Sequence, residues 1–343
     1  QELKLVSELP DELHESSGLI VLDSNRFLSH NDGGDGPKLY VFDSSGTIHR
    51  EVYVRNASNV DWEELAEAPD GRVFIGDFGN NANKRTNLRI YVLPPFASWN
   101  TDTVSADTIQ FTYADQTEFP PAQSNLFYDC EAMVYWRDSL HLFTKNWSSP
   151  FNGYTKHYVL PARAGSYSLI PIDSAYMGGF RELAFITSAD IQSNKLVLLG
   201  SAYVWQFSID SVIRLNQPKL ITLNHLSQKE AIAIHNESLY ITDESTGGFG
   251  NLYRMNLFQT STVFHALNTL ELKVWQREST LMIKSVEPIS SVEVLAVDGK
   301  QLLKQNFLPP VEFANMNVPV QGVVFLNVRL ANGQQVVHKA GLQ

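Results

Sequence analysis

Short hydrophobic stretches separated by polar turns recur along most of the chain. The clearest copy is NVDWEELAEAPDGRVFIGDFGN, residues 59–80, in which an acidic start precedes an apolar strand, a Pro-Asp-Gly turn and a second strand. Related stretches begin at Asp129, Phe180 and Lys229, and a looser one begins at His14. Short runs of β-branched and aromatic residues bounded by Gly, Pro, Asn and Asp are typical of β-strands. Because no long segment has the helical period, the pattern predicts an all-β fold.

Aligning the copies places a glutamate at the start of each first strand and a second polar residue one hairpin later. The glutamates are Glu15, Glu63, Glu131, Glu182 and Glu230, and the second positions are Asn31, Asp77, Lys145, Ser201 and Asp243. A repeat of roughly 50 residues made of short strands is the signature of a β-propeller. Five copies predict five blades within residues 1–267, with six blades as the alternative. The N-terminal strand is expected to close the ring by completing the last blade.

The pattern changes near residue 268, where the repeated glutamate unit stops. Apolar and polar positions alternate strongly in residues 268–343, with Val292 and Val294 on one side of a strand and Leu326 and Val328 on one side of another. Alternation of this kind indicates half-buried strands. We expect this segment to form a separate, small β-sandwich.

Composition narrows the class of partner. The formal net charge of −11 and the lack of a basic stripe exclude a nucleic-acid ligand and leave cation binding open. No run approaches the roughly 18 apolar residues of a membrane span. The single cysteine, Cys130, rules out an internal disulfide bond. It also lies between two carboxylates, which blunts it as a nucleophile.

The repeated acidic residues predict a metal site. Inner strands line the channel of a propeller, so equivalent glutamates would meet at one mouth. Crowded carboxylates repel one another unless a cation or a proton lies between them, and calcium prefers oxygen ligands. The candidate calcium ligands are Glu15, Asp61, Glu63, Asp77, Asp129, Glu131, Glu182, Glu230 and Asp243. The alternative is that each glutamate binds the backbone of the next blade and only locks the repeats together.

Basic and amide side chains at equivalent places are candidates for ligand binding. They are Asn31, Lys145, Arg181 and Lys229, and the acid Asp32 beside Asn31 is a further candidate. His30 is a candidate general base because histidine titrates near neutral pH. The alternative is that the cations are salt-bridge partners of the glutamates.

The C-terminal segment resembles the sorting domain of the type IX secretion system. The residues that carry the resemblance are Asp298-Gly299-Lys300, Pro319-Val320-Gln321-Gly322 with Phe325, the Asn332-Gly333 turn, and His338-Lys339. The Pro-Asn-Pro that commonly opens such domains is absent. The resemblance implies export, with the secretion machinery as a partner.

Residues 1–267 resemble a group of secreted bacterial propellers. The matching motifs are Ser17-Gly18-Leu19, His30-Asn31-Asp32, Asp61-Trp62-Glu63 and Gly76-Asp77-Phe78-Gly79-Asn80. The group has no settled activity, and its broader relatives are calcium-dependent phytase-like and lactonase-like propellers. The resemblance implies a protein that is secreted or held on the outer cell surface.

Two functions are compatible with these features. In the first, the polar funnel binds a glycan or a surface protein without catalysis. In the second, the protein is a metal-dependent hydrolase of an anionic ester or a lactone. No nucleophile and base occur at a recognisable spacing, which favours the first.

Overall fold

The computed structural model describes residues 2–244, 250–257, 272–277, 280–296, 300–318, 322–333 and 335–342. Nearly all regular structure in these residues is β-strand, so the all-β prediction is confirmed. The helical segments are one turn of α-helix, α1 (Arg181–Ala184), and three 3-10 helices, η1 (Asp11–Leu13), η2 (Phe96–Ser98) and η3 (Gln123–Asn125). None of the described helices is long and apolar enough to cross a membrane.

The chain divides into two compact units. One is formed by residues 1–223 with 228–258, and the other by residues 224–227 with 259–343. The boundary predicted between residues 267 and 268 lies outside the described residues, as do the Asp298-Gly299 turn and the Pro319-Val320-Gln321 stretch.

Five sheets make up the described part of the first unit. The first contains β2 (Ser16–Val21), β3 (Arg26–Asn31), β4 (Lys38–Asp43), β5 (Ile48–Val54) and β9 (Thr103–Val104). The second contains β6 (Trp62–Glu67), β7 (Arg72–Asp77), β8 (Arg89–Pro95), β10 (Asp107–Tyr113) and β14 (Gly165–Leu169). The third contains β11 (Asp129–Trp136), β12 (Ser139–Lys145), β13 (Tyr154–Pro161) and β15 (Asp173–Tyr176). The fourth contains β16 (Ser188–Gln192), β17 (Lys195–Leu199), β18 (Tyr203–Ser208) and β19 (Lys219–Thr222). The fifth contains β20 (Gln228–His235), β21 (Ser238–Glu244), β22 (Asn251–Asn256) and β1 (Lys4–Glu8).

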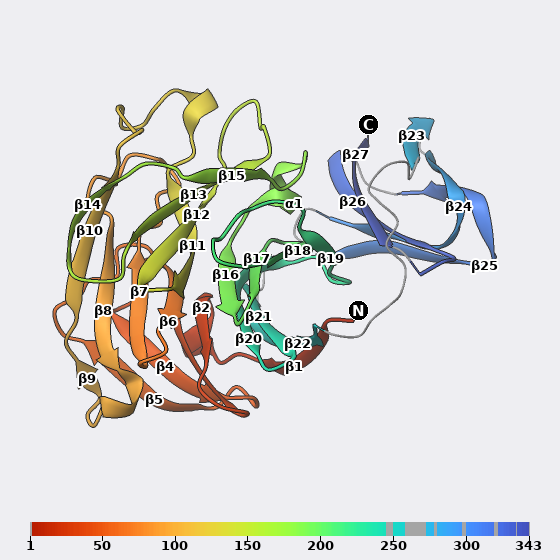
Figure 1. The fold of residues 1–343 in the computed structure, drawn as a ribbon. Helices are drawn as coiled ribbons and strands as arrows, with labels where there is room; N and C mark the ends of the chain where they lie inside the picture. Colours follow the sequence, from red (N-terminus) through yellow and green to blue (C-terminus); the bar gives the residue numbers. More distant parts are fainter. Residues whose placement is uncertain are drawn as a thin grey trace. The chain divides into compact units, whose positions relative to one another are not determined.

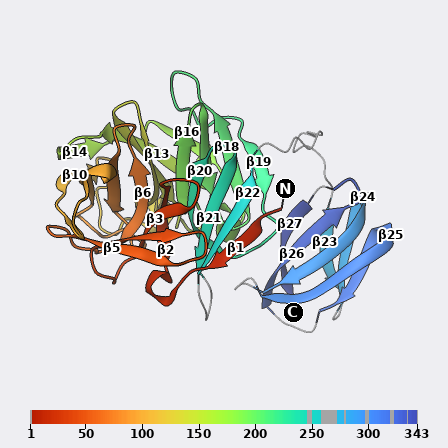
Figure 2. The same cartoon turned by 90° about the horizontal axis from the view of Figure 1, so that it is seen from below.

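The sheets are arranged around one axis as a β-propeller (Figure 1, Figure 2). The inner strands β2, β6, β11, β16 and β20 contact one another in this order, and β20 contacts β2. β1 pairs antiparallel with β22, with Lys4 opposite Arg254, so the last sheet combines the N-terminal strand with strands from the end of the unit.

Two outer strands, β9 and β14, do not pair with the sheet formed by the strands that directly precede them in the chain. β9 lies parallel to β5, with Tyr53 opposite Thr103, and β14 lies parallel to β10, with Ile109 opposite Gly165. The repeat pattern predicted that residues 165–169 belong to the third blade. In the structure they form β14, at the edge of the second sheet. These exchanges connect neighbouring sheets by backbone hydrogen bonds as well as by side-chain packing.

Apolar side chains fill the space between neighbouring sheets. Trp62, fully buried on β6, packs with Leu28 of β3 and Tyr91 of β8 between the first and second sheets. Phe27 of β3 and Tyr240 of β21 meet edge to face between the first and fifth sheets, with ring centroids 5.1 Å apart. Large aromatic side chains therefore bury much of the apolar surface between neighbouring sheets.

The second unit is a sheet of its own with a separate core. It contains β23 (Lys273–Arg277), β24 (Thr280–Leu295), β25 (Gln301–Asn317), β26 (Gly322–Leu330) and β27 (Gln335–Leu342). The long strand β24 pairs with β23, β25 and β26. Val292, Val294, Leu326 and Val328 are all fully buried, as their alternation predicts.

Candidate functional site

A bulge at the start of an inner strand sets the direction of three predicted glutamates. Pairing skips one residue in β6, β11 and β20, and the skipped residues are Glu63, Glu131 and Glu230. A bulge places its extra residue outside the alternation of the ladder and re-aims its side chain. The three carboxylates therefore leave their strands at the same end of the ring. We call this end the funnel; the charged residues gathered there, which interact electrostatically with one another, are Asp32, Asp61, Glu63, Asp129, Glu131, Lys145, Glu230 and Glu244.

Glu15 does not occupy the equivalent place in the first sheet. It precedes β2, its side chain is 41% exposed, and the residue skipped in that strand is Ser17. The prediction that Glu15 opens an inner strand like the other glutamates is therefore wrong.

Glu182 is also misplaced by the sequence alignment, because it lies in α1 and not on a strand. In β11 and β20, the bulged glutamate stands five residues before the strand's last paired residue, Trp136 or His235. In β16 the last paired residue is Gln192, and the residue five positions before it is Thr187. The Thr187 Oγ1 donates a hydrogen bond to the carbonyl oxygen of Lys229 (2.6 Å). The helical turn before β16 shifts the repeat, so the alignment chose a glutamate five residues too early.

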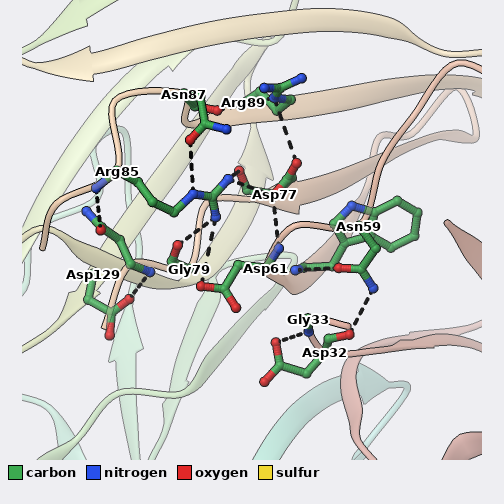
Figure 3. A network of polar contacts seen from close by, with 12 residues as sticks. Asp32, Gly33, Asn59, Asp61, Asp77, Gly79, Arg85, Asn87, Arg89 and Asp129 are labelled. Atoms are coloured by element: carbon green, nitrogen blue, oxygen red, sulfur yellow. Dashed lines mark hydrogen bonds and ion pairs between the residues drawn. The ribbon is translucent and has the colours of Figure 1, made fainter. Parts of the chain in front are cut away.

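Three carboxylates converge where the first and second sheets meet. Asp32 follows β3, Asp61 precedes β6 and Glu63 lies on β6, and one oxygen from each lies within 4.8 Å of the others. Figure 3 shows Asp32 and Asp61 beside each other, with Gly33 between their backbones. A Cβ atom on Gly33 would lie 2.8 Å from Asp61 Oδ1, and one on Gly79 would lie 2.1 Å from Glu63 Oε1. Glycine at both positions leaves room for the cluster.

Glu63 is buried without a hydrogen-bond partner. Its exposed fraction is 4%, and no hydrogen bond or ion pair to its carboxylate is found among the described residues. Burial raises its pKa well above the usual value, and the carboxylates of Glu131 and Asp32 raise it further. Burial likewise raises the pKa of Asp61 to about 7, with Asp32 and Asp129 adding to the effect. Among the described residues, Glu63 therefore has no ion-pair partner, and other carboxylates are its main electrostatic neighbours.

Asp77 differs from this cluster because arginines neutralise it. The Arg85 guanidinium donates to Asp77 Oδ1 (2.8 Å) and to the Gly79 carbonyl oxygen (2.6 Å), and Arg89 Nε lies 3.8 Å from Asp77 Oδ2 (Figure 3). Arg85 is only 3.9 Å from Asp61 Oδ2. The repeat pattern did not indicate Arg85 as a site residue, although the Asn80 side chain that accepts a hydrogen bond from its backbone N–H belongs to a motif already singled out.

Asp129 also has partners on both oxygens. Its Oδ1 accepts a hydrogen bond from the Asn80 backbone N–H, and its Oδ2 accepts one from the Trp147 indole Nε1 (2.6 Å). Asp129 is fully buried, and burial raises its pKa. Its contacts connect the loop after β7 to the loop after β12, so its role is to hold these loops together.

Glu131 is paired with Lys145, whose Nζ lies 2.8 Å from Glu131 Oε1. The Lys145 ammonium also lies over the rings of Trp147 (5.4 Å) and Phe185 (5.2 Å). Burial disfavours the charged form, but the surrounding carboxylates, Glu131 first, raise the pKa of Lys145 above its usual value. Lys145 is therefore a resident cation of the funnel.

The far side of the funnel carries two more acids. Burial raises the pKa of Glu230 to about 7 and that of Glu244 to about 8, with Glu230 adding to the shift of Glu244. Gln228 Nε2 donates to Glu244 Oε2 (2.8 Å). The sequence did not indicate Glu244 as a candidate, because the repeat alignment selects the preceding residue, Asp243, and has no position that corresponds to Glu244.

The remaining predicted residues lie away from an accessible site or have structural partners. His30 is fully buried, packs edge-on against Trp62, and has its pKa lowered by burial to about 4, so it does not fit the predicted general base. Asn31 donates to the Glu12 carbonyl oxygen (2.7 Å). Asp243 accepts hydrogen bonds from Asn251. Lys229 is fully buried, with Nζ 3.3 Å from the Ser201 carbonyl oxygen.

Arg181 lies at the rim of the funnel, on the side that contains Trp147. From α1 it donates to the Ser148 carbonyl oxygen (2.7 Å) and lies over the Phe151 ring. Trp147 and Phe185 are partly exposed, and their ring centroids lie 4.6 Å apart. This side of the funnel is therefore aromatic and cationic, in contrast to the acidic cluster of Asp32, Asp61 and Glu63.

No protein family and no curated protein matches the sequence. Solved structures similar to this chain include a PQQ-bound aldose sugar dehydrogenase from Streptomyces coelicolor, with 10% identity, 74% of this chain and 97% of that chain covered, and a TM-score of 0.45. A gluconolactonase from Xanthomonas campestris has 13% identity, 67% and 68% coverage and a TM-score of 0.38. PorZ, a surface component of the type IX secretion system of Porphyromonas gingivalis, has 12% identity, 96% and 45% coverage and a TM-score of 0.34. Likenesses at these scores do not indicate a shared chemistry.

The donor set of the funnel fits a hard divalent cation. All three convergent side chains offer carboxylate oxygens, and the Val60 carbonyl oxygen lies in the same turn as Asp61, close to Gly33. Oxygen-only sites suit calcium or magnesium, whereas zinc and copper sites are usually built with histidine or cysteine.

Proposed function

We propose that the first unit is a five-bladed propeller, one blade per sheet, whose funnel holds a calcium ion between Asp32, Asp61 and Glu63. The observation that carries this proposal is the carboxylate of Glu63, which is buried among other acids and has no partner among the described residues. A buried charge without a partner is strongly unfavourable, so a proton or a cation must compensate it. Calcium takes six to eight oxygen ligands, which leaves positions for a bound molecule beside the protein's carboxylates.

In this proposal the protein is secreted or held on the outer cell surface, and the funnel binds a glycan or a surface protein without catalysis. The bound ion and the partly exposed Trp147 and Phe185 offer two kinds of contact within one mouth. His30, the candidate general base, is buried under Trp62 and does not reach that mouth. These features support recognition of a ligand more directly than they support turnover.

Melting temperatures in calcium and in chelator test the calcium site. A ligand that binds only the folded state stabilises it by about 2.7 kcal/mol at a hundredfold excess over the dissociation constant. We expect calcium to raise the melting temperature of the unmodified protein, and the double change Glu63→Gln with Glu131→Gln to abolish the increase. Equal melting temperatures in calcium and chelator contradict the proposal, and the acidic ring is then only structural.

The second candidate function is metal-dependent hydrolysis of an anionic ester or a lactone. Asp61 and Glu230 favour it, because burial brings both pKa values to about 7, where a carboxyl group transfers protons efficiently. A screen with phosphate esters and lactones, with and without chelator, distinguishes the two functions. Turnover that chelator abolishes and Asp61→Asn reduces favours the hydrolase.

We also propose that residues 268–343 form a β-sandwich that directs export through a type IX secretion system. The separate core around Val294 and Leu326 and the resemblance of its strands to that family of sorting domains support this proposal. Removing the segment is expected to leave a folded propeller that stays inside the cell. Normal export of the shortened chain contradicts the sorting role.

A further inference from the structure

Two aromatic rings and an ammonium group lie together on one side of the funnel. Trp147 is held by the hydrogen bond from its indole nitrogen to Asp129, and its ring lies 4.6 Å from that of Phe185 at an angle of 54°. The Lys145 ammonium contacts both rings. Trp147 and Phe185 nonetheless remain partly exposed, so part of each side chain is open to contact.

This surface is coupled to the acidic cluster through Asp129. The same carboxylate that holds Trp147 accepts a hydrogen bond from the Asn80 backbone N–H, and the preceding residue, Gly79, lies against Glu63 and Asp61. A molecule bound to an ion at the cluster would therefore lie beside the indole. Glu63 is a buried carboxylate for which no hydrogen bond or ion pair is found among the described residues, and one of its oxygens lies within 4.8 Å of oxygens of Asp32 and Asp61.

The charge of the funnel selects against anions. Seven carboxylates face it, namely Asp32, Asp61, Glu63, Asp129, Glu131, Glu230 and Glu244. Lys145 and one divalent ion supply three positive charges, so the funnel is negative as long as more than three of the seven acids are ionised. Arg85 is already engaged by Asp77. A carboxylate, sulfate or phosphate on the ligand would add like charge to this region.

We infer that the funnel recognises a neutral glycan, whose hydroxyl groups complete the coordination of the bound calcium ion while the apolar face of a sugar ring packs on Trp147 and Phe185. Hydroxyl oxygens are neutral ligands for a hard cation, and the C–H face of a pyranose matches an aromatic ring. This inference rests on the proposed calcium site and narrows the ligand to one chemical class. It also separates this protein from binders of acidic polymers.

The test uses the full-length protein on an array of neutral oligosaccharides built from glucose, galactose and mannose, alongside uronate, sialylated and sulfated glycans. We expect neutral glycans to be retained in calcium and released by chelator, and acidic glycans to be retained at least tenfold more weakly. Retention of acidic glycans in preference to neutral ones overturns the inference, as does an array with no calcium-dependent retention.

Two variants of Trp147 keep the test independent of folding. Trp147→Ala is expected to weaken binding of the best neutral oligosaccharide at least tenfold in calorimetry, while Trp147→Phe keeps an aromatic face and retains most of it. Unchanged binding by Trp147→Ala overturns the inference. The increase in melting temperature with calcium reports the ion site separately: if calcium stabilises the protein but no neutral glycan binds, only the inference fails, and if calcium has no effect, the proposed function fails first.

Discussion

Two consecutive glutamates on β6, Glu63 and Glu64, have opposite surroundings although both are buried. The carboxylate of Glu64 accepts three hydrogen bonds, from Leu65 N–H (3.0 Å), Ser188 Oγ (2.6 Å) and Ala189 N–H (2.9 Å). The carboxylate of Glu63 accepts none from the described residues. Burial raises both pKa values, but only Glu63 has other carboxylates as its main neighbours.

The position of Glu64 explains the difference. It extends from β6 to β16, two inner strands that are not neighbours in the ring, so its side chain crosses the channel. Ser188 in turn accepts a hydrogen bond from Ile232 N–H of β20 (3.1 Å). The polar groups inside the channel therefore satisfy one another and hold the ring together. The Glu63 carboxylate at the funnel has no such partner among the described residues, which is the pattern expected of a site that awaits a ligand.

The largest expected effect is the loss of the contacts inside the channel. Glu64→Ala leaves the Ser188 hydroxyl and the Ala189 N–H without their acceptor inside the protein, where each unsatisfied group costs about 1–3 kcal/mol. We expect the free energy of unfolding to fall by roughly 2–5 kcal/mol in urea denaturation. Glu67→Ala on the exposed end of the same strand is the control and should change it by less than about 0.5 kcal/mol. If the two changes lower the free energy of unfolding equally, the buried hydrogen bonds of Glu64 contribute no more to stability than the exposed side chain of Glu67.

The pH dependence of the funnel comes next. The pKa of Asp61 is about 7 in the folded protein against a usual value of 3.8, so the fold favours its protonated form. This contribution to stability is complete below pH 4 and is lost as pH rises through 7, whereas calcium binding requires the ionised form. Calcium affinity should therefore fall at least about tenfold for each pH unit below 7, because Glu63, whose pKa is also raised, must ionise as well. A calcium affinity that is constant between pH 5 and 8, measured by calorimetry, contradicts this assignment.

The sequence predicted the regular part of this arrangement and missed the parts made by irregular segments. Strand alternation and the repeat located the inner strands, and with them Glu63, Glu131 and Glu230. The helical turn α1 displaced the fourth copy, so that Glu182 was chosen where Thr187 stands. An alignment of repeats also carries no information on which residues of different sheets contact one another.

Loop residues were the hardest part of the site to predict. Asp32 joins Asp61 only because the turn after β3 packs on the start of β6. Arg85 and Trp147 lie after the ends of β7 and β12, where the chain has no period, and hydrogen bonds specific to this protein determine where they point. Periodicity locates strands, but it carries no information on the direction of such loops.

A smaller effect tests the space around the cluster. Gly79→Ala introduces a Cβ atom 2.1 Å from Glu63 Oε1 and 2.6 Å from Asp61 Cγ, so the two carboxylates must separate. We expect calcium affinity to fall about tenfold, while the free energy of unfolding of the metal-free protein changes by less than about 1 kcal/mol. Gly341→Ala, where a Cβ atom would meet nothing within 4 Å, is the matched control. An unchanged calcium affinity in Gly79→Ala places the ion elsewhere.

The most direct measurement is a calcium titration by calorimetry of three proteins: the unmodified chain, Glu63→Gln and Glu64→Gln. Both substitutions remove one carboxylate from the same strand, and only Glu63 belongs to the proposed ion site. We predict one calcium site in the unmodified protein and in Glu64→Gln, and none in Glu63→Gln. No binding to the unmodified protein, or equal binding to Glu63→Gln, contradicts the proposal that the funnel holds calcium.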